Sequence, residues 1–213
     1  MFDAFFVRRL KSPLAFAAKP LDAAGVKATQ VTLIGAVIGL AAAILIAADA
    51  LLLGGLLFLM NRLFDGLDGA LARQQGPTEQ GAFLDITLDF LIYSAIPFAF
   101  AVRDPDVALA AAFLLFSFVG TGSTFLAFSI FATRHGLENE SLKDKSIYYL
   151  QGLTEGFETT LVLTLMCLFP QWFDWLAWGF GALCLMTTGS RIVEGNRVLR
   201  GISTPEPDRL SET

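Results

Sequence analysis

Four aspartates between residues 65 and 89 have the spacing of a metal site. Asp65 and Asp68 are three residues apart and Asp85 and Asp89 are four apart, so each pair shares one face of a helix. If these helices are antiparallel neighbours joined by the polar turn 73–80, the four carboxylates converge. Oxygen ligands with no Cys or His nearby favour Mg²⁺ or Mn²⁺ over Zn²⁺.

The residues around these aspartates are strongly apolar, with flanks that read L-L-L-G-G-L-L-F-L-M and F-L-I-Y-S-A-I-P-F-A-F. Paired aspartates at helical spacing usually form a solvated face, but these flanks argue against one. A single aspartate at the centre of a membrane helix costs roughly 2.5–3.5 kcal/mol. Divalent cations are therefore the natural compensation. Small residues stand among the acids, where a backbone can approach a ligand closely; they are Gly66, Gly69, Ala72 and Gly81.

The stretch resembles the signature of the CDP-alcohol phosphatidyltransferase family, D-x2-D-G-x2-A-R-x7-G-x3-D-x3-D. Its defining positions are all present, as Asp65, Asp68, Gly69, Ala72, Arg73, Gly81, Asp85 and Asp89. Many fixed residues at fixed spacing make this a specific pattern. The resemblance extends to the hydrophobic layout of the whole chain, which is similar to that of small bacterial membrane members.

The resemblance implies an enzyme of phospholipid biosynthesis. It would transfer a phosphatidyl group from CDP-diacylglycerol to a small alcohol or polyol, phosphorylated or not, and release CMP. Two Mg²⁺ or Mn²⁺ ions, roughly 3.5–4 Å apart, would be held by Asp65, Asp68, Asp85 and Asp89. Asp89 would also be the catalytic base for the acceptor hydroxyl.

The resemblance also implies a binding surface for the CDP group. Its expected residues are Asp68, Gly69, Ala72, Arg73, Gly81 and Thr32. The planar guanidinium of Arg73 suits a phosphate.

Two positions depart from the family pattern. Members often carry Pro-Asn in a P-N-x-x-T-like run before the first span, whereas this chain reads A28-T29-Q30-V31-T32 and keeps only Thr32. A diphosphate contact from that asparagine is therefore in doubt. Members that use glycerol phosphate or inositol phosphate often have Lys or Arg directly after the fourth aspartate. Here Phe90 follows, which weakens, without excluding, a phosphorylated acceptor.

The acceptor remains open between two interpretations. Arg134, Lys145 and Arg191 would together bind an acidic head group, although positive-inside topology explains them equally well. Because cytoplasmic basic residues are the more numerous, we favour an anionic or polyol acceptor.

Glu155 and Glu158 support the other interpretation. They are three residues apart inside a predicted membrane helix, where acids are functional by default. They would bind a hydroxyl-rich or amino acceptor, or pair with Arg62 or Arg191.

Composition predicts an all-α polytopic membrane protein. The chain has 213 residues, of which 54% are hydrophobic and 16% charged, with a mean hydropathy of +0.60. We expect one domain over residues 1–203 and a polar tail over 204–213. An amphipathic helix in the membrane interface is predicted over 2–24. Six membrane helices are predicted at about 31–48, 51–71, 81–102, 107–132, 148–169 and 172–193.

Basic residues predict the orientation. They gather at one end of the predicted spans, Arg103 stands alone at the other, and Arg62 lies within the second span near the acidic cluster. This places both termini and the aspartates on the cytoplasmic side of a bacterial inner membrane. Cys167 and Cys184 lie in apolar runs and are interpreted as small hydrophobic residues. A homodimer is expected, and no nucleic-acid partner.

Two other functions compete with the first. Within the family, a CDP-linked small alcohol would donate its phospho-head group to a lipid hydroxyl. From another class, a divalent-cation transporter would use the four aspartates. Transporters more typically place acids at the bilayer midplane on broken helices in repeated halves, whereas this chain shows no repeat and its acids stand near one face.

Overall fold

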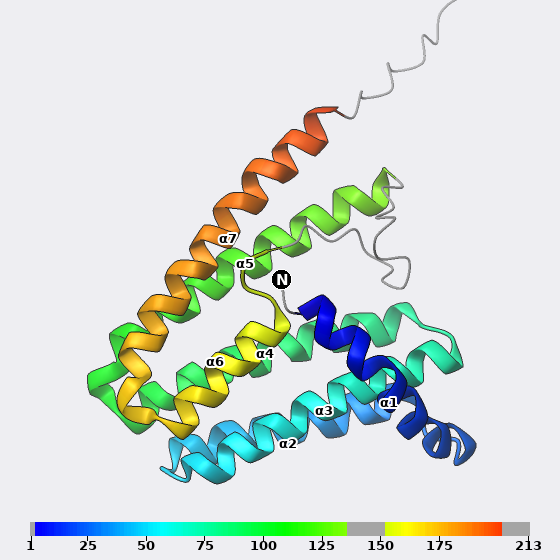
Figure 1. Ribbon diagram of the computed structural model, residues 1–213, viewed down its shortest axis with the longest axis horizontal. Helices are drawn as coiled ribbons and strands as arrows, with labels where there is room; N and C mark the ends of the chain where they lie inside the picture. Colours follow the sequence, from blue (N-terminus) through cyan, green and yellow to red (C-terminus); the bar gives the residue numbers. More distant parts are fainter. Residues whose placement is uncertain (1–2, 136–151, 202–213) are drawn as a thin grey trace, which may run out of the picture.

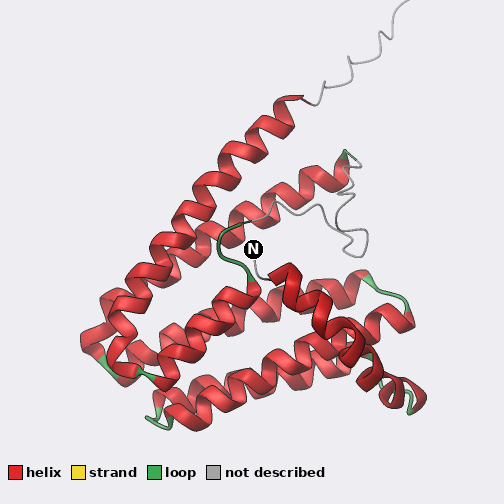
Figure 2. Ribbon diagram, viewed as in Figure 1, coloured by secondary structure: helices red, strands yellow, loops and turns green. Residues whose placement is uncertain are grey.

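The computed structural model describes residues 3–135 and 152–201, and all regular secondary structure in these residues is helical (Figures 1 and 2). The predicted all-α class is confirmed. The helices are α1 (Asp3–Ala23), α2 (Ala28–Ala47), α3 (Leu51–Gln75), α4 (Glu79–Arg103), η1 (Pro105–Val107), α5 (Ala108–Arg134), α6 (Gly156–Leu168), η3 (Pro170–Trp172) and α7 (Phe173–Gly201).

Helices α2, α3 and α4 form an antiparallel group linked by short turns. Asp49, with φ 67°, turns the chain between α2 and α3, and Gly76, with φ 92°, ends α3. Thr78 begins α4 by accepting a hydrogen bond from the Gly81 N–H at 3.0 Å. The polar turn expected between the two acidic helices is therefore present, but it is shorter than predicted.

Small residues let these helices pack closely. A Cβ added to Gly35 would lie 3.0 Å from the Cβ of Phe64 on α3, and one on Gly39 would lie 2.7 Å from Ile92 on α4. A Cβ on Gly54 would lie 2.9 Å from the backbone oxygen of Ala42. The G35-A-V-I-G39 run of α2 thus serves packing within the chain.

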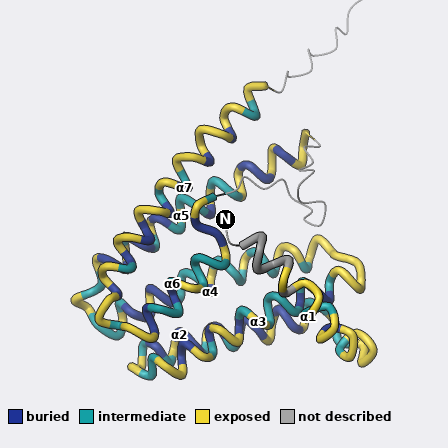
Figure 3. Tube along the Cα trace, viewed as in Figure 1, coloured by how far each residue is buried: buried dark blue, intermediate teal, exposed yellow. Residues whose placement is uncertain are grey.

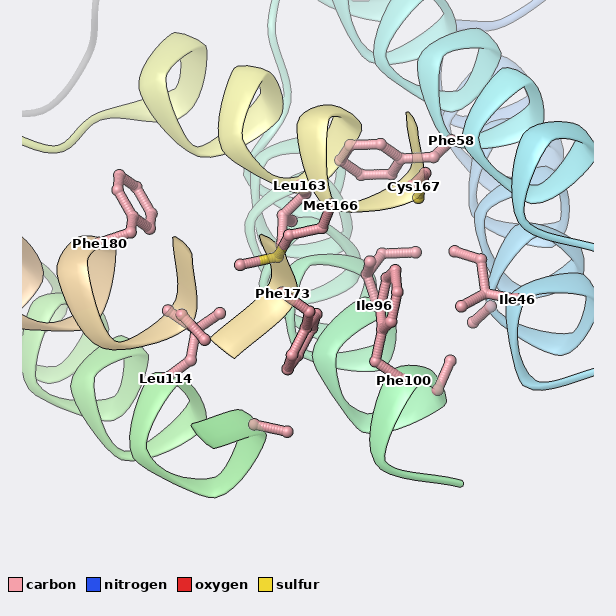
Figure 4. Close-up of a cluster of buried hydrophobic side chains, with 14 of the residues drawn as sticks. Ile46, Phe58, Ile96, Phe100, Leu114, Leu163, Met166, Cys167, Phe173 and Phe180 are labelled. Atoms are coloured by element: carbon pink, nitrogen blue, oxygen red, sulfur yellow. The ribbon is translucent and has the colours of Figure 1, made fainter. Parts of the chain in front are cut away.

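The second half consists of α5 and α7, which lie side by side, with the shorter α6 between them and the first helices (Figure 1). The rings of Phe113 and Trp178 stack at 4.4 Å across the α5–α7 interface. A buried apolar cluster joins the two halves, with Phe58, Ile96, Leu114 and Phe173 among its members (Figure 4).

Both cysteines, Cys167 and Cys184, are free and buried in that cluster. They pack as small hydrophobic residues, as the sequence predicts.

The predicted fifth membrane helix, 148–169, is wrong over residues 152–155. Its first residues, 148–151, lie outside the described part of the chain, and α6 begins only at Gly156. Glu155 is the N-cap of α6, and Glu158 completes a capping box with it. Because of this capping the helix begins after Thr154 and Glu155, two polar residues that the hydropathy pattern places inside the predicted membrane helix. With 13 residues, α6 is about 20 Å long.

Four of the described helical segments are long and apolar enough to cross a membrane: Ala28–Ala47, Glu79–Arg103, Pro105–Arg134 and Pro170–Gly201. Large apolar side chains are exposed along them, among them Val37, Leu109, Phe116 and Met186. Exposed positions recur along the whole length of these helices (Figure 3). Such a surface suits lipid rather than water. Helix α3 is equally long, but it carries Arg62 and two aspartates.

Helix α1 packs against the C-terminal half of α3. Its Ala18 is buried with Ala70 and Leu71, and its Leu14 contacts the backbone at Gly66. The helix predicted over residues 2–24 is thus present, whereas its place in a membrane interface stays a prediction.

We predict that Gly54→Ala destabilises the protein by about 1–3 kcal/mol, because the new methyl group would meet backbone atoms of α2 that a rotamer change cannot move. Thermal unfolding in detergent measures this change. Gly189→Ala, which meets nothing within 4 Å on α7, is the matched control. Equal melting temperatures of the two variants would contradict the close α2–α3 contact.

Candidate metal centre and active site

The antiparallel pairing of α3 and α4 brings the four aspartates to one pocket. Its other walls come from α2, from Asn61 and Arg62 of α3 and from apolar residues of α4. The pocket is lined by Thr32, Gly35, Ala36, Asn61, Arg62, Asp65, Asp68, Asp85, Leu88, Asp89 and Ile92. The convergence predicted from helical spacing is confirmed.

Three of the carboxylates form a tight group. One oxygen from each of Asp65, Asp68 and Asp85 lies within 4.8 Å of the others. Asp68 is only 4% exposed, and its Oδ2 has no hydrogen-bond partner among the described residues. A buried carboxylate oxygen without a partner is costly. The all-oxygen donor set and this unpartnered atom both fit a hard divalent cation such as Mg²⁺ or Mn²⁺.

Asp89 has a different environment. Its Oδ1 forms a short ion pair with Nη1 of Arg62. The same Nη1 lies 3.9 Å from Oδ2 of Asp65. One guanidinium therefore stands between a carboxylate of α3 and a carboxylate of α4.

The Arg62 side chain is held on several sides. Its Nε and Nη2 donate to Oδ1 of Asn61 at 2.9 and 2.6 Å, and Nδ2 of Asn61 donates to the Gly35 carbonyl at 2.8 Å. The guanidinium carbon lies 4.5 Å from the ring centroid of Tyr93. The Tyr93 hydroxyl donates to the carbonyl of Gly156 at 3.3 Å. This network ties the site to α2, α3, α4 and α6.

The sequence contains a signal for this network. Asn61 and Arg62 follow ten apolar or glycine residues directly, and Arg62 stands three residues before Asp65, on the same helix face. The sequence suggested Arg62 only as a partner of Glu155 or Glu158, whereas the structure pairs it with Asp89 and Asp65. Asn61 and Tyr93 were not singled out.

The residues expected at the CDP group lie towards the α3–α4 turn. Thr32 lines the pocket, and its hydroxyl donates to the Ala28 carbonyl at 3.1 Å. Arg73 is exposed, and its Nη1 lies 3.5 Å from the position of a Cβ added to Gly69. Gly81 sits in the first turn of α4, and Ala72 is partly buried on α3. Their contacts with a nucleotide stay a prediction.

Of the basic residues suggested for the acceptor, the two that the structure describes, Arg134 and Arg191, do not line the pocket. Arg134 is exposed at the end of α5, and Lys145 lies outside the described residues. Arg191 is buried on α7, where its Nη1 donates to the Thr121 carbonyl at 3.2 Å and its Nη2 lies 3.2 Å from the Cβ position of Gly152.

The two glutamates have structural contacts at the start of α6. Glu155 accepts a hydrogen bond from the Gly152 N–H at 3.1 Å, and Glu158 accepts one from the Glu155 N–H at 3.3 Å. Their expected place inside a membrane helix is therefore wrong for Glu155, which precedes α6.

Phe90 packs against α5. Its Cε1 lies 2.9 Å from the position of a Cβ added to Gly122. The position after the fourth aspartate, where the family resemblance suggested that a basic residue is often found, thus contributes an apolar contact between α4 and α5.

Comparison with known proteins identifies the family of this chain. Residues 26–186 match the profile of the CDP-alcohol phosphatidyltransferase family. The chain belongs to this family. That region contains α2 to α6 and all four aspartates.

Two curated relatives extend the comparison. The inner membrane protein YnjF of Escherichia coli strain K12 is 47% identical over 203 residues, which cover 95% of this chain and 98% of that protein. The archaetidylinositol phosphate synthase of Pyrococcus horikoshii is 36% identical over 95 residues, or 44% of this chain and 50% of that protein.

The fold is similar to that of phosphatidylinositol phosphate synthase (PgsA1) of Mycobacterium tuberculosis. The structure of PgsA1 with CDP-DAG bound has a TM-score of 0.68 and 22% identity, with 94% of this chain and 98% of that chain covered. PgsA1 in complex with manganese and citrate has a TM-score of 0.67 and 22% identity, covering 94% and 93% of the two chains. At this identity the likeness concerns the fold.

We predict that Asp68→Asn and Asp85→Asn each weaken Mn²⁺ binding at least ~10-fold, since each removes an anionic oxygen from the three-carboxylate group. Isothermal titration calorimetry of the full-length protein in detergent measures the affinity for Mn²⁺. Asp174→Asn, which changes an acid of α7 outside the pocket, should bind Mn²⁺ like the original chain. Equal affinities in all four proteins would show that the pocket is not the cation site.

Proposed function

We propose that this membrane transferase moves a phosphatidyl group from CDP-diacylglycerol to a small alcohol or polyol, phosphorylated or not, and releases CMP. The observation that carries the proposal is the group of Asp65, Asp68 and Asp85, with its buried unpartnered oxygen, inside the complete family signature. A diphosphate linkage needs positive charge beside it when the bond to CMP breaks.

A CDP-linked lipid is the donor that the comparisons favour. PgsA1, which shares the fold, has been solved with CDP-DAG bound, and the P. horikoshii relative is named as a synthase of a phospholipid. The opposite arrangement, a CDP-linked small alcohol with a lipid hydroxyl as acceptor, has no comparable support here. A cation transporter is disfavoured because the family is one of transferases.

Asp65, Asp68 and Asp85 would hold Mg²⁺ or Mn²⁺, and Asp89 would contribute to a second ion in the two-ion arrangement that the family resemblance implies. A divalent cation bound there neutralises the diphosphate and makes its phosphorus more electrophilic. The manganese in one PgsA1 structure supports this choice of ion.

The protein's own residues have three tasks in the reaction. Asp89 takes the proton from the acceptor hydroxyl, whose oxygen then attacks the phosphorus that carries the diacylglycerol. The bond from that phosphorus to the CMP oxygen breaks, and CMP leaves. Arg73, exposed near Gly69, binds the phosphates of the nucleotide.

The acceptor is proposed to be anionic or polyol in character. The names of PgsA1, a phosphatidylinositol phosphate synthase, and of the P. horikoshii archaetidylinositol phosphate synthase support it. Glu155 and Glu158 both cap α6, so their carboxylates already have a structural role. They therefore support a cationic acceptor less strongly than the sequence suggested. Phe90 packs at Gly122 and is apolar, which argues against a phosphate contact from that position.

We also propose that the chain crosses a bacterial inner membrane six times, as a homodimer with both termini in the cytoplasm. In this arrangement α3 and α6 add to the four long apolar segments, and α1 lies in the interface. The relation to an inner membrane protein supports the location.

Purified protein with CDP-diacylglycerol, Mg²⁺ and a panel of inositol, inositol phosphate, glycerol phosphate and serine should release CMP with at least one acceptor. Asp89→Asn should lower that rate ~10²–10⁴-fold, as expected when a general base is lost. Chelation of the metal should stop the reaction, and Asp174→Asn should leave it unchanged. Chromatographic detection of CMP is the measurement. A full rate in excess chelator would reject the metal-assisted mechanism.

Single cysteines test the orientation. Asp106→Cys, at the α4–α5 turn, should react with an impermeant thiol reagent on cells with a permeabilised outer membrane, whereas Glu79→Cys, at the start of α4, should react only after lysis. Native Cys167 and Cys184 are buried and give little background. The reverse pattern would place the aspartates on the other side of the membrane.

A further inference from the structure

Gln75, the last residue of α3, holds the connection between α1 and α2 through three hydrogen bonds. Its Nε2 donates to the Val26 carbonyl at 2.7 Å and to Oδ1 of Asp22 at 3.0 Å. Its Oε1 accepts a hydrogen bond from the N–H of Ala28, the first residue of α2, at 3.2 Å. One side-chain amide therefore satisfies a carbonyl and an N–H at the point where α2 begins.

Local hydrogen bonds order the rest of this connection. Gly25, with φ 74°, turns the chain after α1, and the Val26 N–H donates to the Leu21 carbonyl at 3.0 Å. The Lys27 N–H donates to Oε1 of Gln30 at 2.9 Å. The first N–H of α2 bonds instead to a side chain of α3, so the exact start of α2 depends on that distant residue.

The start of α2 lies beside the donor end of the proposed site. A Cβ added to Gly81 of α4 would lie 3.8 Å from Cγ2 of Thr29, and Thr32, one turn further along α2, lines the acidic pocket. Arg73, proposed to bind the nucleotide phosphates, stands two residues before Gln75 on α3. A shift in the first turn of α2 would therefore move Thr29 and Thr32 relative to Gly81 and the pocket.

From these contacts we propose that Gln75 is a positioning residue for the CDP-linked lipid. It sets where α2 begins and thereby the place of Thr32 at the pocket. The proposal rests on the function proposed above and adds a residue that acts through α2 on the donor end of that site.

The bond to Ala28 exists because this chain departs from the family pattern. Ala28 stands where that pattern often has proline, and proline has no N–H to donate. A proline at the first position of a helix fixes its own φ. In this chain an alanine, which does not fix φ, is held by Gln75 instead.

Apolar packing in the same region cannot replace this bond. Val31 is buried with Ala70 and Leu71, and Val26 and Ala28 pack against that cluster. Such contacts hold α2 against α3, but they are non-directional. The hydrogen bonds of a planar amide are directional, so they fix the backbone at the start of α2.

The test is steady-state release of CMP by the full-length protein in mixed micelles. Gln75→Ala removes all three hydrogen bonds and should raise the KM for CDP-diacylglycerol about 5-fold. The kcat and the KM for the acceptor should stay within ~2-fold, because the aspartates are untouched. A loss of folded protein would lower the apparent kcat and would not raise this KM.

A rescue variant separates positioning from general stability. Ala28→Pro, made together with Gln75→Ala, fixes φ at the start of α2 by a covalent ring. Lys27 has φ −84° and ψ 145°, the extended conformation that a residue before proline prefers. The ring needs the place next to Oε1, so the glutamine must be absent. The double variant should return the KM for CDP-diacylglycerol to within ~2-fold of the original value.

Gln74→Ala is the matched control. Gln74 is the neighbouring glutamine, and its Nε2 donates to the Ala15 carbonyl of α1 at 2.9 Å, so its loss loosens α1 and leaves the bonds to the start of α2. Its KM for CDP-diacylglycerol should stay within ~2-fold. An unchanged KM in Gln75→Ala, an equal rise in Gln74→Ala, or no recovery in the double variant would overturn the proposal.

Hydrogen–deuterium exchange distinguishes a failure of this proposal from a failure of the proposed function. Gln75→Ala should speed the exchange of backbone amides over residues 26–32 at least ~3-fold, and Gln74→Ala should not. No CMP release by the original chain, together with this exchange pattern, would overturn the proposed function while Gln75 still sets the start of α2. CMP release with unchanged exchange in Gln75→Ala would overturn the role of Gln75 alone.

Discussion

The mutual repulsion of four carboxylates in an apolar helix pair is the constraint on which the rest of this structure depends. Like charges at this proximity are costly to bury unless cations compensate them or protons neutralise them. The chain supplies one cation of its own, Arg62, next to Asp89 and Asp65. The group of Asp65, Asp68 and Asp85 leaves the remaining compensation to a ligand.

The packing of the helices serves this arrangement. Glycines of α2 let α3 and α4 approach from both sides, so the acidic faces of the two helices meet. The buried cluster around Phe58, Leu163 and Phe173 attaches the second half of the chain to this group. Tyr93 links the site to α6 through the Gly156 carbonyl, so the start of α6 and the acidic pocket are mechanically connected.

Helical spacing was sufficient to predict that each aspartate pair shares a helix face, because residues three or four apart on an uninterrupted helix have little freedom in where they point. Their convergence also required the antiparallel pairing of the two helices, which the short polar turn favoured. It did not predict the contacts of Asp89, which depend on the rotamers of Arg62 and Asn61 and on a carbonyl of α2. Hydropathy likewise predicted a helix through Glu155. It averages over a window, whereas the start of α6 is decided by the local capping of Glu155 and Glu158.

The central claim is that Asp65, Asp68 and Asp85 hold a divalent cation. Anomalous diffraction from crystals of the protein grown with Mn²⁺ tests it most directly. We predict a strong manganese peak at bonding distance, roughly 2.0–2.2 Å, from an oxygen of each of these three residues. A well-ordered pocket with no manganese peak among these carboxylates would contradict the account.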